Sequence, residues 1–274
     1  MTIDLSVRGD QRSWSPRRRA RTARGVQYAL LLAIVAAALI ATDWERLGVT
    51  VFNVEAASAL VGKLPQAFLN TLLYTVCAFA VGLSLGTLLA LMRLSKIAPY
   101  RWIATTYIEF FRGIPALLVV IATYYALPQV LGIKLTSASA VAAIALGSVS
   151  AAYIAETMRA GIQAVPKGQV EAARSLGMSH SRTLVKVVLP QAFRMVLPPL
   201  TNEILLLTKD TSLLFAIGLM PVQYELTKIG RDALSSGGGG GLTPLFVIGA
   251  CYLIITIPLG LLTRWLERKT GGHA

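Results

Sequence analysis

The most polar stretch in the interior of this sequence, residues 166–190, interrupts a chain that is otherwise largely apolar. Pro166 has no amide hydrogen and suits the first position of a helix, and Gly177 can adopt the left-handed conformation that ends one. A short helix is therefore predicted at about 167–176, with Glu171 on its polar face. The narrow apolar face of this helix is predicted to hold Val170, Ala173 and either Leu176 or Gly177. Such a helix is too polar to cross a membrane and too short to be stable alone in water, so it needs a protein surface to dock against.

The spacing within this stretch resembles the EAA signature of ABC-importer permeases. The matching residues are Glu171, Ala172, Ala173, Gly177, Leu189 and Pro190, with Val187 where Ile is usual. In that family the segment is the cytoplasmic coupling helix, which sits in a cleft of a separate ATP-hydrolysing subunit. The resemblance implies that these six residues couple the chain to such a subunit. The alternative is an ordinary amphipathic helix in a loop, with no partner.

Composition places the chain in a membrane. Of its 274 residues, 55% are hydrophobic and only 14% are charged, which is typical of a protein with several membrane spans. The net charge of +13 would suggest nucleic acid in a soluble protein, but here the basic residues lie between apolar spans, so no nucleic-acid partner is predicted. Cys77 and Cys251 lie within apolar spans, and no zinc spacing or phosphate-binding loop is present. We therefore predict no metal site, no bound cofactor and no catalytic residues, so the chain is not expected to be an enzyme.

Apolar runs predict an all-α integral membrane protein with about six spans. They lie at 26–42, 66–92, 103–127, 137–155, 191–208 and 243–263. Residues 1–25 form a basic tail, and no clear cleavage site follows the first span, so that span is expected to remain as a helix. A short apolar piece at 213–220 is interpreted as re-entrant, and the glycine run at 235–241 as a flexible external loop.

The basic residues are distributed unevenly across these spans. All but six of the 26 Lys and Arg residues fall in segments that the six-span topology places on one side. The exceptions are Arg46, Lys63, Lys134, Lys209, Lys228 and Arg231. Because basic loops stay in the cytoplasm, both termini and residues 166–190 are predicted to be cytoplasmic, where ATP is available.

Further stretches resemble the permeases of polar amino acid ABC importers. They are Ile108–Pro115, Tyr124–Pro128, Ala152–Glu156, Gly161–Gly168, Leu197–Glu203 and Lys209–Leu213, within a resemblance that covers about 65–270. The resemblance implies a five-helix type I importer core, here preceded by an extra N-terminal span. The domains expected from it are a tail at 1–25, the extra span at 26–42, the permease domain at 66–264 with its cytoplasmic coupling loop at 157–190, and a cytoplasmic tail at 265–274.

The same resemblance implies the partners of the chain. Two cytoplasmic ATPase subunits would use ATP and magnesium, a second permease chain, identical or different, would complete the pathway, and an extracytoplasmic amino-acid-binding protein would deliver substrate. All of them would meet at the bilayer of the bacterial inner membrane. The rival hypothesis is an ion-coupled secondary transporter or channel, because charges at membrane depth and broken helices suit that class as well. The coupling segment argues against this rival.

Four polar residues near the end of the fifth predicted span are candidates for the substrate pathway. Asn202 and Lys209 are seven residues apart, as are Glu203 and Asp210, so the two pairs form neighbouring stripes on a helix. Ionisable groups at membrane depth are costly and usually functional, and Glu203 is expected to face a cationic amino group. The alternative is a local pair between Lys209 and Asp210. Asn70 is expected either to contact substrate or to cap a break in the backbone.

Two further charged pairs, each three residues apart, are interpreted as structural ion pairs on helices. The first, Glu109 with Arg112, is predicted to lie near the cytoplasmic end of the third span. The second is Glu156 with Arg159, at the inner end of the fourth span.

Overall fold

The computed structural model describes residues 16–236 and 241–270. The predictions for residues 1–15 and 271–274 of the two tails, and for residues 237–240 of the glycine run, therefore lie outside the described residues. The chain divides into two compact units, 1–50 and 51–274. The first contains helix α1 (Pro16–Ala41) and most of α2 (Trp44–Val51). The apolar part of α1, Ala23–Ala41, is long enough to cross a membrane, which agrees with the predicted N-terminal span.

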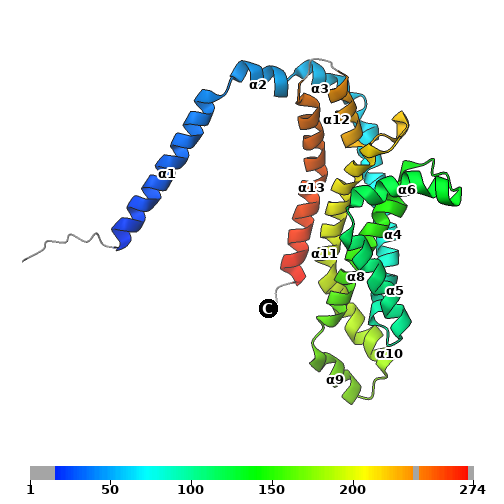
Figure 1. Cartoon of the computed structure of the whole chain (residues 1–274). Helices are drawn as coiled ribbons and strands as arrows, with labels where there is room; N and C mark the ends of the chain where they lie inside the picture. The colour runs from blue at the N-terminus through cyan, green and yellow to red at the C-terminus, as the bar shows by residue number, and fades with distance from the viewer. Residues whose placement is uncertain (1–15, 237–240, 271–274) are drawn as a thin grey trace, which may run out of the picture. The chain divides into compact units, whose positions relative to one another are not determined.

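The second unit is built from helices alone in the part that the structure describes. In order these are α3 (Val54–Val61), α4 (Leu64–Leu94), α5 (Ala98–Gly113), α6 (Ala116–Leu131), α7 (Ala138–Val141), the π-helical turn η1 (Ala142–Leu146), α8 (Gly147–Gln163), α9 (Lys167–Ser175), α10 (His180–Thr183), the π-helical turn η2 (Leu184–Val188), α11 (Leu189–Asp210), the 3-10 helices η3 (Thr211–Ala216) and η4 (Pro221–Gln223), α12 (Leu226–Ser235) and α13 (Thr243–Thr270). The long helices α4, α8, α11 and α13 run lengthwise, with α9 at one end of the unit and α3 and α12 at the other (Figure 1).

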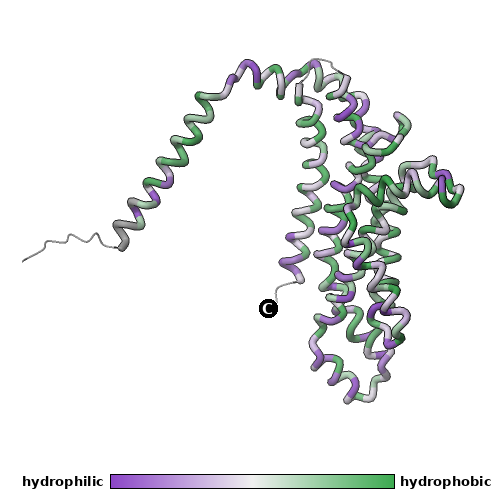
Figure 2. The backbone as a smooth tube through the Cα atoms, viewed as in Figure 1, coloured by the Kyte–Doolittle hydropathy of each residue, from purple (hydrophilic) through white to green (hydrophobic). Residues whose placement is uncertain are grey.

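Four helical segments are long and apolar enough to cross a membrane. They are the C-terminal part of α1, all of α4, the run from α7 to α8 and all of α13. Along α13 the hydrophobic residues give way to hydrophilic ones at its C-terminal end (Figure 2). The remaining long helix, α11, is the fifth predicted span; it contains prolines and several polar residues and is not among these four.

The third predicted span is not one continuous helix, so that expectation is corrected. The chain bends by 104° between α5 and α6, and the two helices together would make a fifth span or a re-entrant loop. Ile114 at the bend has an extended backbone, with φ −106° and ψ 137°. It precedes Pro115, whose ring disfavours the helical conformation in the preceding residue. The Ile-Pro pair therefore breaks the helix.

Helices α4 and α8 pack closely through glycine. A Cβ atom on Gly82 would lie 2.9 Å from the hydroxyl of Ser150, and one on Gly86 would lie 2.8 Å from the carbonyl oxygen of Ala151. Only residues without a side chain let two helix backbones approach so closely. The spacing of the two glycines thus serves the packing of α4 against α8.

Side chains of α4 hold the turn that precedes α12. The amide of Asn70 donates to the carbonyls of Val222 and Tyr224 at 2.9 and 2.8 Å, and the Tyr74 hydroxyl donates to Gln223 at 2.8 Å. The Thr71 hydroxyl accepts from the amide of Leu226. We call these contacts the 222–226 clamp.

One element near the clamp was not predicted from the sequence, namely helix α12, which lies in a region assigned to the outer side. The apolar piece at 213–220 lies in the 3-10 helix η3 and the irregular segment after it, and its re-entrant character stays a prediction.

Candidate functional site: a coupling surface and a broken-helix cavity

Helix α9 begins and ends where the sequence predicts, to within a residue. Gly177 has a φ of +80°, the left-handed conformation that glycine adopts most readily. Its amide donates to the carbonyl of Arg174 at 3.0 Å, and the amide of Met178 donates to Ala173 at 3.2 Å. These two bonds close the C-terminal end of the helix. Gly177 therefore sets the direction in which the chain leaves α9.

The two faces of α9 are clearly different. Ala173 is 6% exposed and Val170 is half-buried, and the inner face packs near a cluster of Val165, Val188 and Ala192. Leu176 is 85% exposed, so it belongs to the outer face and not to the apolar inner face considered from the sequence. The residues of the EAA pattern that are exposed are Glu171, Ala172, Gly177, Leu189 and Pro190.

This outer face combines a carboxylate with an exposed leucine and small residues. A short helix that presents such groups beyond the end of a bundle suits docking into a groove of another protein. Ala173 instead packs inward and holds α9 against the bundle.

A cavity of about 470 Å³ lies where the α5–α6 break meets α8 and α11. Residues 112–116 contribute the wall at the break, from Arg112 to Ala116, the first residue of α6. Helix α8 contributes Ser150 and Tyr153, and α11 contributes Glu203 and Asp210. The predicted stripe of Glu203 and Asp210 thus faces one cavity. Asn202 and Lys209 are exposed on the neighbouring side of α11 and do not line it. Asn70 does not line it either, because its side chain belongs to the 222–226 clamp.

The charged groups of this cavity are not neutralised by one another. Within residues 16–236 and 241–270, no ion pair within 4 Å joins Arg112, Glu203 or Asp210 to any partner, and none joins Asp210 to Lys209. The guanidinium of Arg112 lies 5.8 Å from the ring centroid of Tyr153. The cavity therefore presents both a cationic group and carboxylates to a ligand.

Arg112 is the cavity residue that the sequence interpretation missed. It was paired with Glu109 near the cytoplasmic end of a span, but Glu109 is exposed and forms no ion pair within the described part of the chain. Arg112 instead lies at the far end of α5, next to the break. The signal that could have found it is the Ile114-Pro115 pair, because a broken helix at membrane depth commonly marks a binding site.

Glu156 has two partners at the opposite end of the bundle from α12. It pairs with Arg159 at 2.8 Å, as predicted, and also with Arg93 of α4. The carboxylate thus ties α4 to α8 near the point where α8 leads to α9.

Comparison with known proteins agrees with this architecture. Residues 82–272 match the family described as the binding-protein-dependent transport system inner membrane component. The probable glutamine ABC transporter permease protein GlnM of Bacillus subtilis (strain 168) is 38% identical over 204 residues, which are 74% of this chain and 91% of that protein. The glutamate/aspartate import permease protein GltK of Escherichia coli O6:H1 is 36% identical over 227 residues, covering 78% of this chain and 97% of that protein.

Solved structures lead to the same family. The crystal structure of an amino acid ABC transporter with histidines contains a chain that is 35% identical, with a TM-score of 0.68, covering 79% of this chain and 96% of that one. The MetNI methionine ABC transporter in an inward-facing conformation shares the fold at 21% identity and a TM-score of 0.58, covering 77% of this chain and 95% of that one. With the match over residues 82–272, these findings show that the chain belongs to the family of inner-membrane permease components of binding-protein-dependent transport systems.

Proposed function

We propose that this permease imports polar amino acids across the bacterial inner membrane and forms half of a translocation pathway driven by a separate ATPase. Relatives at 35% identity or more are permeases for glutamine, arginine, glutamate with aspartate, and L-cystine, according to their names. The observation that carries the proposal is the broken-helix cavity, with a cation and two carboxylates that leave one another unpaired.

A zwitterionic amino acid matches the polar groups of this cavity. Ala116, the first residue of α6, lies at its wall. Because a half-helix N-terminus carries partial positive charge, this end of α6 and Arg112 suit a carboxylate. Glu203 and Asp210, on the α11 wall, suit an ammonium group. The bound molecule would supply ion-pair partners to Arg112, which is exposed, and to Glu203 and Asp210, which are half-buried, and this favours amino acids over uncharged solutes.

A second permease chain would face the exposed side of α11. Asn202 and Lys209 are exposed there at membrane depth, where contact of a charged side chain with lipid tails is expensive. If a second permease chain covers that side, both residues line the seam between the two halves. Asn202 and Lys209 would then belong to the same pathway as Glu203 and Asp210, although they do not line the same cavity.

The coupling surface of α9 would dock on the ATPase. Glu171, Ala172, Leu176 and Gly177 form its exposed part, and the six residues of the EAA pattern define the segment. ATP and magnesium would be bound by the ATPase and not by this chain. Closure of two ATPase subunits would draw two coupling helices together and rock the bundles between inward and outward access, a rigid-body change between two states.

Orientation follows from charge and arrangement. The C-terminal end of α13 lies toward the same end of the second unit as α9 (Figure 1). Because the basic segments belong in the cytoplasm, we assign α9 and both termini to that side. The outer end, with α3 and α12, would then receive substrate from an extracytoplasmic binding protein.

Uptake by the reconstituted complex tests this function. The tagged chain is extracted in mild detergent with whatever subunits remain bound, and the complex is placed in liposomes with ATP on the coupling side and radiolabelled glutamine, arginine or glutamate with the binding protein on the other. We expect ATP-dependent uptake of one or more of these amino acids. Glu203→Gln should reduce that uptake about tenfold, while Glu109→Gln, exposed and outside the cavity, should not.

The broken α5–α6 pair also suits an ion-coupled secondary transporter. That alternative predicts uptake by the chain alone, driven by an ion gradient without ATP. Recovery of the chain without an ATPase subunit, together with such uptake, would replace the importer by the secondary transporter.

A further inference from the structure

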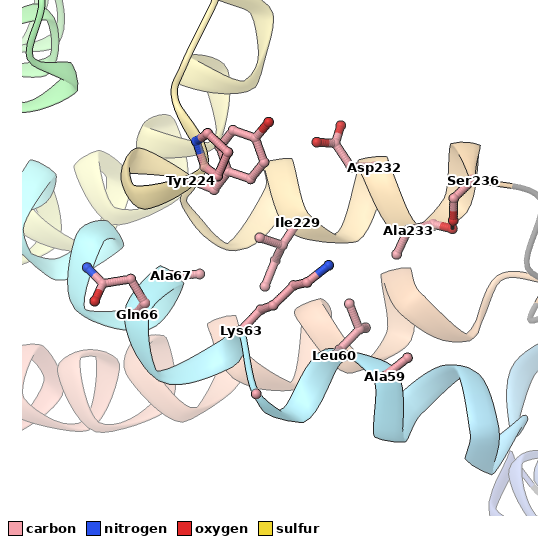
Figure 3. A pocket seen from close by; sticks show the side chains of 12 residues that line it. Ala59, Leu60, Lys63, Gln66, Ala67, Tyr224, Ile229, Asp232, Ala233 and Ser236 are labelled. Atoms are coloured by element: carbon pink, nitrogen blue, oxygen red, sulfur yellow. Dashed lines mark hydrogen bonds between the residues drawn. The ribbon is translucent and has the colours of Figure 1, made fainter.

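A second cavity lies at the N-terminal end of α4. It has a volume of about 650 Å³ and is enclosed by the end of α3, the start of α4, the turn at Pro221 and Tyr224, and one side of α12 (Figure 3). Its volume is within the range of small-molecule sites in proteins. None of its lining residues lines the broken-helix cavity, so we call it the outer cavity.

Opposite charges stand on two walls of the outer cavity. Lys63, the residue before α4, extends toward α12, and Asp232 lies on the α12 wall (Figure 3). Within the described part of the chain the two form no ion pair within 4 Å, and Lys63 has no other ion-pair partner. Asp232 already forms an ion pair with Lys228, whose ammonium donates to Oδ1 at 2.8 Å, so a ligand ammonium would use the other oxygen, Oδ2.

The floor between these charges is apolar. Leu60, Ala67 and Ile229 line the cavity, and each is at least 95% buried. Such a floor cannot satisfy a polar ligand along its whole length, but it can contact the carbon atoms of a small molecule whose two ends are charged. The wall groups and the floor together select a compact molecule with one negative and one positive end.

The α12 wall is held in place before any ligand arrives. The 222–226 clamp fixes the backbone of Tyr224, and the carboxylate of Glu225 accepts from the amides of Thr227 and Lys228 at 2.6 and 2.7 Å to cap α12. A site whose supporting residues are already ordered loses little entropy on binding. The fold therefore sets the position of the α12 wall that carries Asp232, while Lys63 approaches it as an exposed side chain.

We propose that the outer cavity is a second binding site for a zwitterionic α-amino acid, with the carboxylate on Lys63 and the ammonium on Asp232. Binding at this site does not depend on the proposed function. Its use as a first stop on the way in rests on that function, because the proposed orientation places the cavity on the side that receives substrate.

A cysteine on the cavity wall reports occupancy directly. The permease–ATPase complex is placed in nanodiscs without any binding protein, and Ala233→Cys, which lines the cavity, is reacted with a cationic thiol reagent. L-glutamine, L-arginine and L-glutamate are each added at millimolar concentration. We expect at least one to slow labelling threefold or more. Ser235→Cys, exposed on α12 but not lining the cavity, should label at an unchanged rate, and the native Cys77 and Cys251 serve as the background.

Charge variants assign the protection to this cavity. Lys63→Met and Asp232→Asn, each combined with Ala233→Cys, should abolish protection, and Lys63→Arg should retain it. Glu203→Gln should leave protection intact, because Glu203 lines the other cavity. Elution of each complex at its normal volume on size exclusion shows that the variants assemble, so lost protection reports the site and not misfolding.

Three results would overturn the proposal. The first is no protection by any of the three amino acids. The second is equal protection by acetate that needs Lys63 but not Asp232, which would make the cavity an anion pocket for an acidic side chain of a docking protein. The third is protection that Glu203→Gln removes and Lys63→Met does not. Protection without ATP-driven uptake would refute the proposed function and leave this site standing, and uptake without protection would do the reverse.

Discussion

The coupling surface and the broken-helix cavity treat polar groups in opposite ways. On α9 the polar and apolar groups of the outer face are exposed on a single short helix, and only Ala173 and Val170 pack inward. In the cavity the charged groups come from two separate helices and face a common space without pairing. The exposed side chains of α9 can be replaced without disturbing the bundle, whereas the geometry of the cavity depends on how several helices pack.

This difference separates two kinds of loss. A change on α9 should break the connection to the ATPase and leave substrate recognition intact. A change in the cavity, or in the packing that shapes it, should alter recognition or assembly and leave docking intact. Variants that mix these effects would show that the two regions are not independent.

The largest effect is expected from Gly86→Val. A Cβ atom at this position would lie 2.8 Å from the carbonyl oxygen of Ala151, so α4 and α8 would have to separate. We expect the variant to lose assembly or to melt at a much lower temperature, measured by thermal unfolding of the purified complex. Gly249→Val on α13 is the matched control, because a Cβ atom there would meet no neighbour within 4 Å among the described residues. Equal melting of the two variants would contradict the packing role.

Gly177→Val should break coupling with little effect on folding. A β-branched residue is strained at a φ of +80°, so the chain leaving α9 would change direction. We expect ATP-driven uptake to fall at least about tenfold, while membrane insertion and the amino-acid protection of Ala233→Cys in the outer cavity persist. Gly168→Ala, on the same helix with open space around it in the described part of the chain, should retain uptake. Normal uptake by Gly177→Val would remove the exit angle of α9 from the coupling mechanism.

Arg112→Met should affect recognition and spare docking. Loss of the guanidinium removes a donor for the substrate carboxylate, and hydrogen bonds to charged groups contribute about 1.5–3 kcal/mol. We expect the KM for uptake to rise about tenfold or more, with the ATPase subunit still recovered in pull-downs. Arg264→Met, exposed near the end of α13, is the control. An unchanged KM would exclude Arg112 from the substrate site.

The smallest effect is a pH dependence from the outer end of the unit. Glu225, in the connection that precedes α12, is fully buried, and this burial raises its pKa to about 7 from 4.5, although the amides of Thr227 and Lys228 oppose the rise. The folded state therefore binds a proton more tightly than the unfolded state. The contribution of Glu225 to the free energy of unfolding is therefore complete below pH 4.5 and is lost as the pH rises through 7.

Each tenfold change in proton affinity corresponds to about 1.4 kcal/mol, so this contribution is at most about 3 kcal/mol. We expect the melting temperature of the complex to rise between pH 8 and pH 6. Glu225→Gln should flatten this dependence, and Glu55→Gln on α3 should not. A profile that is the same in Glu225→Gln as in the native protein would contradict the assignment.

The local structure of the α9 segment could be predicted because the residues that determine it are contiguous in the sequence. Pro166, Glu171 and Gly177 lie within one turn-helix-turn segment, and the left-handed glycine and the helix follow from local preferences. The family and the membrane class likewise follow from local spacing and composition. In each case the neighbours along the chain are sufficient.

The cavity could be predicted only in part because its residues meet across the bundle. The spacing of Glu203 and Asp210 put both on one face of a helix, but nothing in the sequence said that Arg112 would lie on the opposing wall. The apolar run at 103–127 led to the prediction of one continuous span, so the break at Ile114 was missed. Leu176 was misplaced for a related reason, since helical periodicity alone does not say where the bundle ends.

The 222–226 clamp has a mechanical consequence for the transport cycle. Asn70, Thr71 and Tyr74 tie the turn before α12 to α4, and Gly82 and Gly86 seat α4 against α8. The turn at 222–226, α12, α4 and α8 should therefore move together as one rigid body. A displacement of α9 would then be transmitted to α12 through this rigid body. The bend between α5 and α6, where the helical hydrogen bonding is interrupted, would be the hinge of the motion.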